Sequence, residues 1–158
     1  MQVEHINPFI TAVSNTFSMM VQTTADRGQL TLGDPQHRTH PISAIIGLSG
    51  RASGTVVINL SESVALAAAS ALLMEEVSEV NGDVLDAVGE LVNMIAGQAK
   101  AELAEYELAI SLPNVVTGEG HEVRFPSGTA PLCVPFNTEH GPLRLEVGFE
   151  PSAAPVAV

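Results

Sequence analysis

Apolar residues recur at every third or fourth position in three stretches of the chain, a spacing typical of helices with one buried face. These stretches cover about residues 4–21, 61–74 and 83–104. In the third, the apolar stripe consists of Leu85, Val88, Val92, Ile95, Ala99 and Leu103. The second is apolar almost all the way round from Val64 to Leu73, so we expect that helix to be deeply buried.

Polar residues that favour helix starts lie near the beginning of each stretch. Asn7 precedes Pro8, an order that predicts an N-cap followed by the first helical residue. Ser61 is a good N-cap for the second helix, and Asn81 for the third.

The remaining apolar segments alternate or are rich in β-branched residues, as strands are. They lie at residues 29–32, 40–48, 54–60, 107–112, 122–125, 130–136 and 143–149. The turn Ser49-Gly50-Arg51 predicts a hairpin between the second and the third. The order of one helix, strands, two helices and strands predicts an α+β fold, with about three helices packed on one face of an antiparallel β-sheet. Residues 1–150 would form a single domain, and residues 151–158 a flexible C-terminal tail.

The charge of the chain narrows the choice of partners. The formal net charge is −12, and the six Lys and Arg residues are scattered. Because binding to a phosphate backbone needs clustered cations, nucleic acid and anionic membrane surfaces are disfavoured. The longest apolar run, residues 64–74, is too short to span a bilayer, and no signal peptide is visible. Cys133 is the single cysteine, which excludes an internal disulfide and fits a cytoplasmic protein.

A column of polar residues occupies the face of the third helix opposite its apolar stripe. In Asp86-Ala-Val-Gly-Glu90-Leu-Val-Asn93 the two acids and the carboxamide stand at i, i+4 and i+7, so their side chains share one helix face. Gly97 and Ala101 continue this face and leave room for a partner to approach. An outward Glu90–Asn93 pair is able to hold a partner and orient a water molecule. The same spacing also fits an ordinary solvated polar stripe, and both interpretations stay open.

The other polar residues predict no metal or nucleophile site. His37 and His40 lie three residues apart in a Pro-flanked loop that offers no third ligand. No serine has the Gly-x-Ser-x-Gly context of a nucleophile elbow. We therefore expect no metal bound by this chain.

The residues from Asp86 to Lys100, Asp-Ala-Val-Gly-Glu-Leu-Val-Asn-Met-Ile-Ala-Gly-Gln-Ala-Lys, resemble the signature helix of the CheC/CheX/FliY phosphatases of bacterial chemotaxis. That signature is Asp or Ser, three residues, Glu, two residues and Asn, followed by small residues. Asn7-Pro8-Phe9-Ile10 and the apolar helix after it also resemble CheX, and the element order agrees to about Phe149. A single copy of the helix motif favours CheX over CheC, whose members typically carry two.

This resemblance implies a protein phosphatase that acts on a phosphorylated CheY-like receiver domain. Asn93 would orient the water that attacks the aspartyl phosphate, Glu90 would pair with a lysine of the receiver, and Asp86 would play a supporting part. The resemblance also implies a homodimer. It implies no cofactor of the chain's own, because the Mg²⁺ ion of the reaction would belong to the receiver.

Two functions of other classes remain open. One is a non-catalytic adaptor, or signalling interaction module, on the same fold. The other is a structural or assembly module in which the polar column is merely solvated.

Overall fold

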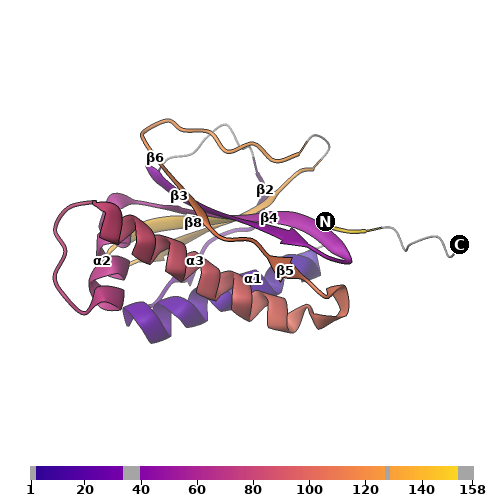
Figure 1. Cartoon of the computed structure of the whole chain (residues 1–158), viewed down its shortest axis with the longest axis horizontal. Helices are drawn as coiled ribbons and strands as arrows, with labels where there is room; N and C mark the ends of the chain where they lie inside the picture. Colours follow the sequence, from indigo (N-terminus) through magenta and orange to yellow (C-terminus); the bar gives the residue numbers. More distant parts are fainter. Residues whose placement is uncertain (1–2, 34–39, 127–128, 153–158) are drawn as a thin grey trace, which may run out of the picture.

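The computed structural model describes residues 3–33, 40–126 and 129–152 of the chain, and its main layer is an antiparallel sheet (Figure 1). The strands follow the order β1-β7-β8-β4-β3-β5, with β2 also paired to β7 and β6 to β3. Their bounds are β1 Asp26–Arg27, β2 Thr31–Leu32, β3 Ile42–Ser49, β4 Ala52–Leu60, β5 Ala109–Ile110, β6 Asn114–Thr117, β7 Leu132–Thr138 and β8 Gly141–Pro151. The predicted hairpin is confirmed, because β3 and β4 pair from Ile42↔Leu60 to Leu48↔Gly54.

The helices form a second layer on one face of the sheet (Figure 1). They are α1 (Val3–Thr16), its π-helical continuation η1 (Phe17–Val21), α2 (Glu62–Leu73) and α3 (Gly82–Glu102), followed by a short 3-10 turn, η2 (Ala104–Tyr106). This arrangement confirms the predicted α+β fold with helices packed on one face of an antiparallel sheet.

The hydrophobic core lies between these two layers. Alternate residues of the central strands point toward the helices and are fully buried, among them Ile46 on β3, Ile58 on β4 and Leu145 on β8. From α3 the stripe residues Val88, Val92, Ile95, Ala99 and Leu103 enter the same core, as predicted, while Leu85 is partly buried against it. Each large aliphatic side chain buried in this way stabilises the fold by about 1.5–3 kcal/mol.

The first helix starts earlier than its sequence signal predicts. The helix begins at Val3 and Pro8 lies inside it, so the prediction of Asn7 as N-cap is wrong. The preceding turn is held by tertiary packing: His5 is buried, shares a hydrogen bond with the Tyr106 hydroxyl at 3.1 Å and packs edge-on against Phe149. Burial of the Tyr106 hydroxyl, together with the nearby carboxylates of Glu105 and Glu4, raises its pKa above the ordinary value.

The segment between β6 and β7 crosses the face of the sheet that the helices leave open (Figure 1). The His121 ring joins it to the sheet, with Nε2 2.6 Å from Ser43 Oγ and Nδ1 2.7 Å from the carbonyl oxygen of Gly118. The predicted strand at residues 122–125 is wrong, because Phe125 packs over Gly148 on this face instead of joining the sheet.

Two further differences concern the strands. The sequence prediction missed two strands, β1 and β6, and β6 pairs with β3 from Ile42↔Thr117 to Ile45↔Asn114. At the other end, β8 continues to Pro151 and the Ser152 N–H donates to the Arg51 carbonyl at 2.8 Å. Pro151 and Ser152, the first two residues assigned to the tail, therefore pair with β4 and the turn before it. Residues 153–158 of that tail lie outside the described residues.

Candidate functional site

The polar column is carried by α3, whose start is fixed by a side-chain cap. The Asn81 side-chain oxygen accepts a hydrogen bond from the Val84 N–H at 3.0 Å, which confirms the predicted N-cap. With the apolar stripe buried on the opposite side, the rotation of the helix is set by the core. Asp86, Glu90 and Asn93 are thereby held on the outer side of the helix layer.

The structure brings the five predicted site residues together on this outer side. Asp86, Glu90 and Ala101 are exposed, whereas Asn93 and Gly97 are half-buried. At a rise of about 1.5 Å per residue, Glu90 and Asn93 are roughly one turn apart, and the whole column is about 22 Å long. Among the described residues, none makes a hydrogen bond or ion pair with the side chain of Asp86, Glu90 or Asn93. The carboxylates and the carboxamide are thus available to a partner.

The two glycines inside α3 have different surroundings. A Cβ at Gly89 would lie 3.4 Å from Pro113 Cγ, an ordinary contact distance, so the segment before β6 covers this position of the helix. A Cβ at Gly97 would meet nothing within 4 Å beyond its own helix. Glycine in a helix interior costs about 1 kcal/mol relative to alanine. The fold covers Gly89 and leaves Gly97 open, which fits the prediction that Gly97 leaves room for a partner.

A shallow hollow of about 340 Å³ lies beside the column, between α3 and the C-terminal end of α2. Its α3 side consists of Asp83, Asp86, Ala87 and Glu90, and its α2 side of Leu72 and Leu73. Leu73 is 39% exposed, and Met74 after it is 91% exposed. The prediction that α2 is buried all round is therefore wrong at its C-terminal end, which extends past the edge of the core.

Sequence reasoning missed the residues of this apolar wall because they continue an apolar run that reads as core. The signal that marks them is the sequence that follows. Glu75 and Glu76 come directly after Met74, and carboxylates at that position must face water. The last apolar residues of the helix therefore stand at the boundary between core and solvent.

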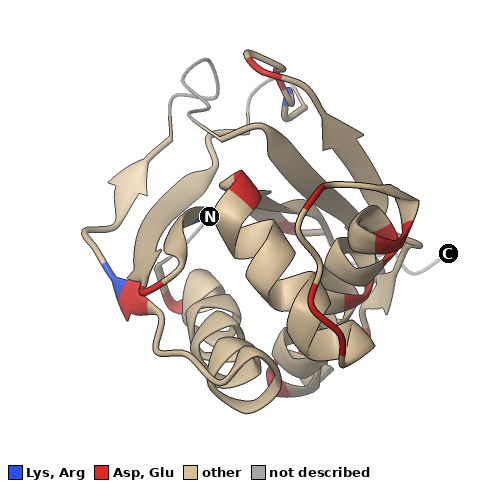
Figure 2. Ribbon diagram, turned by 90° about the vertical axis from the view of Figure 1, so that its left-hand side faces the viewer, with Lys and Arg blue, Asp and Glu red and all other residues tan. Residues whose placement is uncertain are grey.

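The surroundings of the hollow are acidic. The segment that joins α2 to α3 carries Glu75, Glu76 and Glu79 and no Lys or Arg. Figure 2 shows Asp and Glu along this segment and on the adjoining helices, with Lys and Arg at a distance from it in this view. A partner that covers the hollow therefore meets a negative field and gains from cations of its own.

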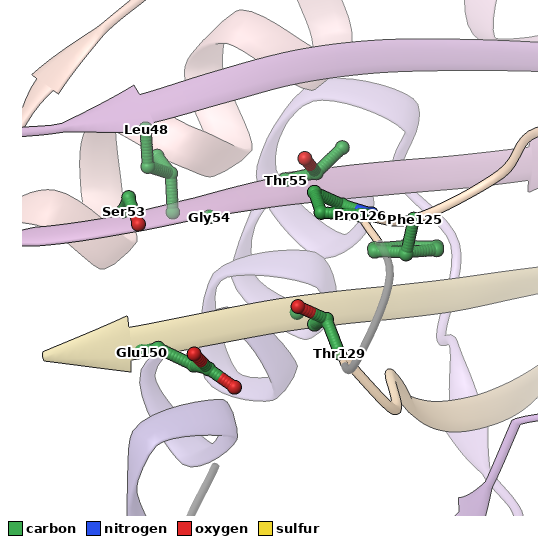
Figure 3. A pocket seen from close by; sticks show the side chains of 9 residues that line it. Leu48, Ser53, Gly54, Thr55, Phe125, Pro126, Thr129 and Glu150 are labelled. Atoms are coloured by element: carbon green, nitrogen blue, oxygen red, sulfur yellow. The ribbon is translucent and has the colours of Figure 1, made fainter.

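A second hollow, of about 350 Å³, lies on the opposite face of the sheet, where Phe125 and Thr129 lean over β4 and β8 (Figure 3). Glu150 is the one titratable residue among those that line it. Its walls hold no pair of side chains comparable to Glu90 and Asn93.

Across residues 3–33, 40–126 and 129–152, no group of three or more His, Cys, Asp or Glu side chains is arranged to hold a metal ion. His37 lies outside the described residues, so the His37–His40 pair is untested. None of the helices in these ranges has both the length and the hydrophobicity that a bilayer crossing requires.

Comparison with known proteins identifies the family. A family model described as chemotaxis phosphatase CheX matches residues 42–137, which include β3, β4, α2 and all of α3. The chain belongs to the CheX family. The family resemblance predicted from the α3 motif is thereby confirmed. A search of curated protein sequences gave no significant match.

Solved structures support this CheX assignment over nearly the whole chain. A chemotaxis protein CheX from Desulfovibrio desulfuricans is 31% identical, with a TM-score of 0.85 over 94% of this chain and 100% of that one. A putative chemotaxis protein from Desulfovibrio vulgaris Hildenborough is 33% identical, with a TM-score of 0.83 over 94% and 97%. CheX in a CheX–CheY–BeF₃–Mg²⁺ complex from Borrelia burgdorferi shares the fold, at 23% identity and a TM-score of 0.77 over 94% and 99%.

Proposed function

We propose that this CheX-family protein hydrolyses the aspartyl phosphate of a CheY-type receiver domain. One observation carries the proposal: Glu90 and Asn93 stand about one turn apart on the outer side of α3, and no described residue engages their side chains. The family description as a chemotaxis phosphatase supports it, as does the complex of the Borrelia relative with CheY.

In this proposal Asn93 orients the attacking water. Its side-chain carbonyl accepts a hydrogen bond from the water while its NH₂ donates to a phosphoryl oxygen. A carboxamide is a poor base, so it positions the water without deprotonating it. Phosphoryl transfer through a loose transition state needs mainly such positioning and charge neutralisation. The water oxygen bonds to phosphorus, the bond to the aspartate oxygen breaks, and inorganic phosphate and a free carboxylate result.

Glu90 has the task of holding the receiver. A carboxylate next to the phosphoryl group would repel it, whereas a carboxylate facing a lysine of the receiver forms a charge-assisted pair. Asp86, one turn before Glu90, supports the same contact. Gly97 and Ala101 have little or no side chain, which allows the receiver to lie close to α3. The Mg²⁺ ion that neutralises the phosphate is assigned to the receiver, and this chain contributes no cofactor.

We also propose that the protein is a homodimer. The exposed apolar side chain of Leu32 supports this, because it is 73% exposed on the edge strand β2. An apolar side chain on an unpaired edge is a site where a second chain is able to add.

The test is the decay of phosphorylated receiver with and without the protein. CheY-type receivers of the same genome would be phosphorylated with acetyl phosphate, freed of excess reagent, and followed by phosphate release. Acceleration by catalytic amounts of protein is the expected result. Binding of the phosphorylated receiver without acceleration would identify a non-catalytic adaptor instead, and neither binding nor acceleration would favour a structural module.

A further inference from the structure

Two apolar side chains at the C-terminal end of α2 are exposed beside the polar column. Leu73 lines the hollow whose other wall includes Asp86 and Glu90, so any partner that covers Glu90 approaches Leu73 as well. Met74 follows at the end of the helix and is 91% exposed. Large apolar side chains bordering a polar site are typical of interaction surfaces.

Met74 also occupies an unfavourable backbone conformation. Its φ of 56° and ψ of 36° are left-handed, and its N–H closes the helix on the Ser70 carbonyl. Glycine or asparagine is the usual residue at such a helix end, because a Cβ clashes there. The fold alone would be better served by Asn or Gly at position 74. A bulky apolar side chain that faces water from a strained position points to a role outside the fold.

Charge identifies the kind of surface that fits. Leu73 and Met74 are followed by Glu75 and Glu76, and three of the six residues that line the hollow are acidic. None of those six is Lys or Arg. The complementary surface therefore has an apolar side chain surrounded by cations.

We propose that Leu73 and Met74 form the apolar anchor on which the receiver domain docks, with an apolar side chain of the receiver flanked by Lys or Arg seated against them. This inference rests on the proposed function, since it places the second contact of the same receiver. It also gives a chain with a net charge of −12 a contact with the receiver that does not depend on the charge of the receiver. Burial of apolar surface supplies an attraction that does not depend on opposite charge.

The variant Met74→Asn tests the anchor, because asparagine suits the left-handed conformation while removing the apolar side chain. Steady-state hydrolysis would be measured with acetyl-phosphate-treated receiver at increasing concentrations. We expect the KM to rise about ten-fold, as for the loss of one buried apolar side chain, with kcat little changed. The Tm should stay the same or rise. A purely structural role for Met74 would lower the Tm and leave the KM unchanged.

Met19→Gln is the matched control, because Met19 is also exposed, at 70%, but lies on η1. Ser18, next to Met19, lines a hollow together with Glu139. The turn that follows Glu139 lies against Ser63, at the N-terminal end of α2, whereas Met74 lies at the C-terminal end of the same helix. Equal KM values for Met74→Asn, Met19→Gln and the wild type would overturn the anchor alone. Absence of wild-type turnover with every receiver would overturn the proposed function and the anchor with it.

Discussion

At the scale of single residues, the roles proposed for Glu90 and Asn93 follow from their chemistry. A carboxamide both donates and accepts hydrogen bonds, which suits it to a water and a phosphoryl oxygen at once. A carboxylate only accepts and is negative, which suits it to a cation. Their exposure also differs: the Glu90 side chain is exposed, whereas Asn93 is half-buried.

We predict that Glu90→Gln raises the KM for phosphorylated receiver about ten-fold, while kcat changes much less. The variant loses a charge-assisted contact that holds the receiver both before and during the reaction. Initial rates over a range of receiver concentrations separate the two constants. Glu102→Gln is the control, since Glu102 is exposed on the same helix outside the column. A KM for Glu90→Gln equal to that of the control would remove the docking role.

At the scale of elements, α3 joins the core to the site. Its apolar stripe and its Asn81 cap fix where the helix lies and how it is rotated, so residues on its outer side need no further support from the fold. Gly89 lies on the side of α3 that the fold covers, and Gly97 on the side that it leaves open. Pro113 and Val115 cover Gly89, and nothing beyond the helix itself covers Gly97.

We predict that Gly97→Ala raises the free energy of unfolding by about 1 kcal/mol and the Tm by about 2–4 °C, since alanine favours the helix and meets no neighbour. The same variant should raise the KM for the receiver, because the added methyl group stands where the partner approaches. Thermal unfolding and steady-state kinetics measure the two effects. Gly89→Ala is the control for the KM, because its methyl group is covered by Pro113 and no receiver reaches it. A stabilised Gly97→Ala with a wild-type KM would show that the receiver does not lie over this position.

The spacing of apolar residues was enough to predict those helices and strands that bury one regular face in the core. This holds for α3 with its stripe, for the β3–β4 hairpin and for the outward position of Glu90 and Asn93. It failed where distant residues decide. The turn before Pro8 is helical because His5 packs against Tyr106 and Phe149, and residues 122–125 leave the sheet because Phe125 packs over Gly148. The Leu72–Leu73 wall was missed because sequence alone does not show where α2 passes the edge of the core.

At the scale of the whole molecule, the helices cover one face of the sheet, and the proposed binding site lies on the outer side of this helix layer (Figure 1). The Asp and Glu positions on that side, red in Figure 2, make long-range attraction to a negatively charged partner weak. In the proposed complex, local contacts therefore provide the affinity: the Glu90 carboxylate, the open backbone at Gly97 and the apolar end of α2.

The proposed homodimer concerns the assembly of whole molecules. We predict that sedimentation equilibrium at micromolar concentration gives twice the mass of the 158-residue chain. Leu32→Gln should shift the equilibrium toward the monomer, because it puts a polar side chain on the exposed edge strand β2. A clean monomer for the wild-type protein at that concentration would contradict the dimer without bearing on the site on α3.

The central claim is that Asn93 orients the water that hydrolyses the aspartyl phosphate. The most direct measurement is the decay of phosphorylated receiver in the presence of Asn93→Ala, with Asn15→Ala, an exposed asparagine on α1, as the control. Alanine favours the helix, so the fold and the affinity for the receiver should persist. We expect kcat to fall about 100-fold or more with Asn93→Ala, as for the loss of a group that positions the reacting atoms, and Asn15→Ala to behave like the wild type. Decay with Asn93→Ala as fast as with the wild-type protein would contradict it.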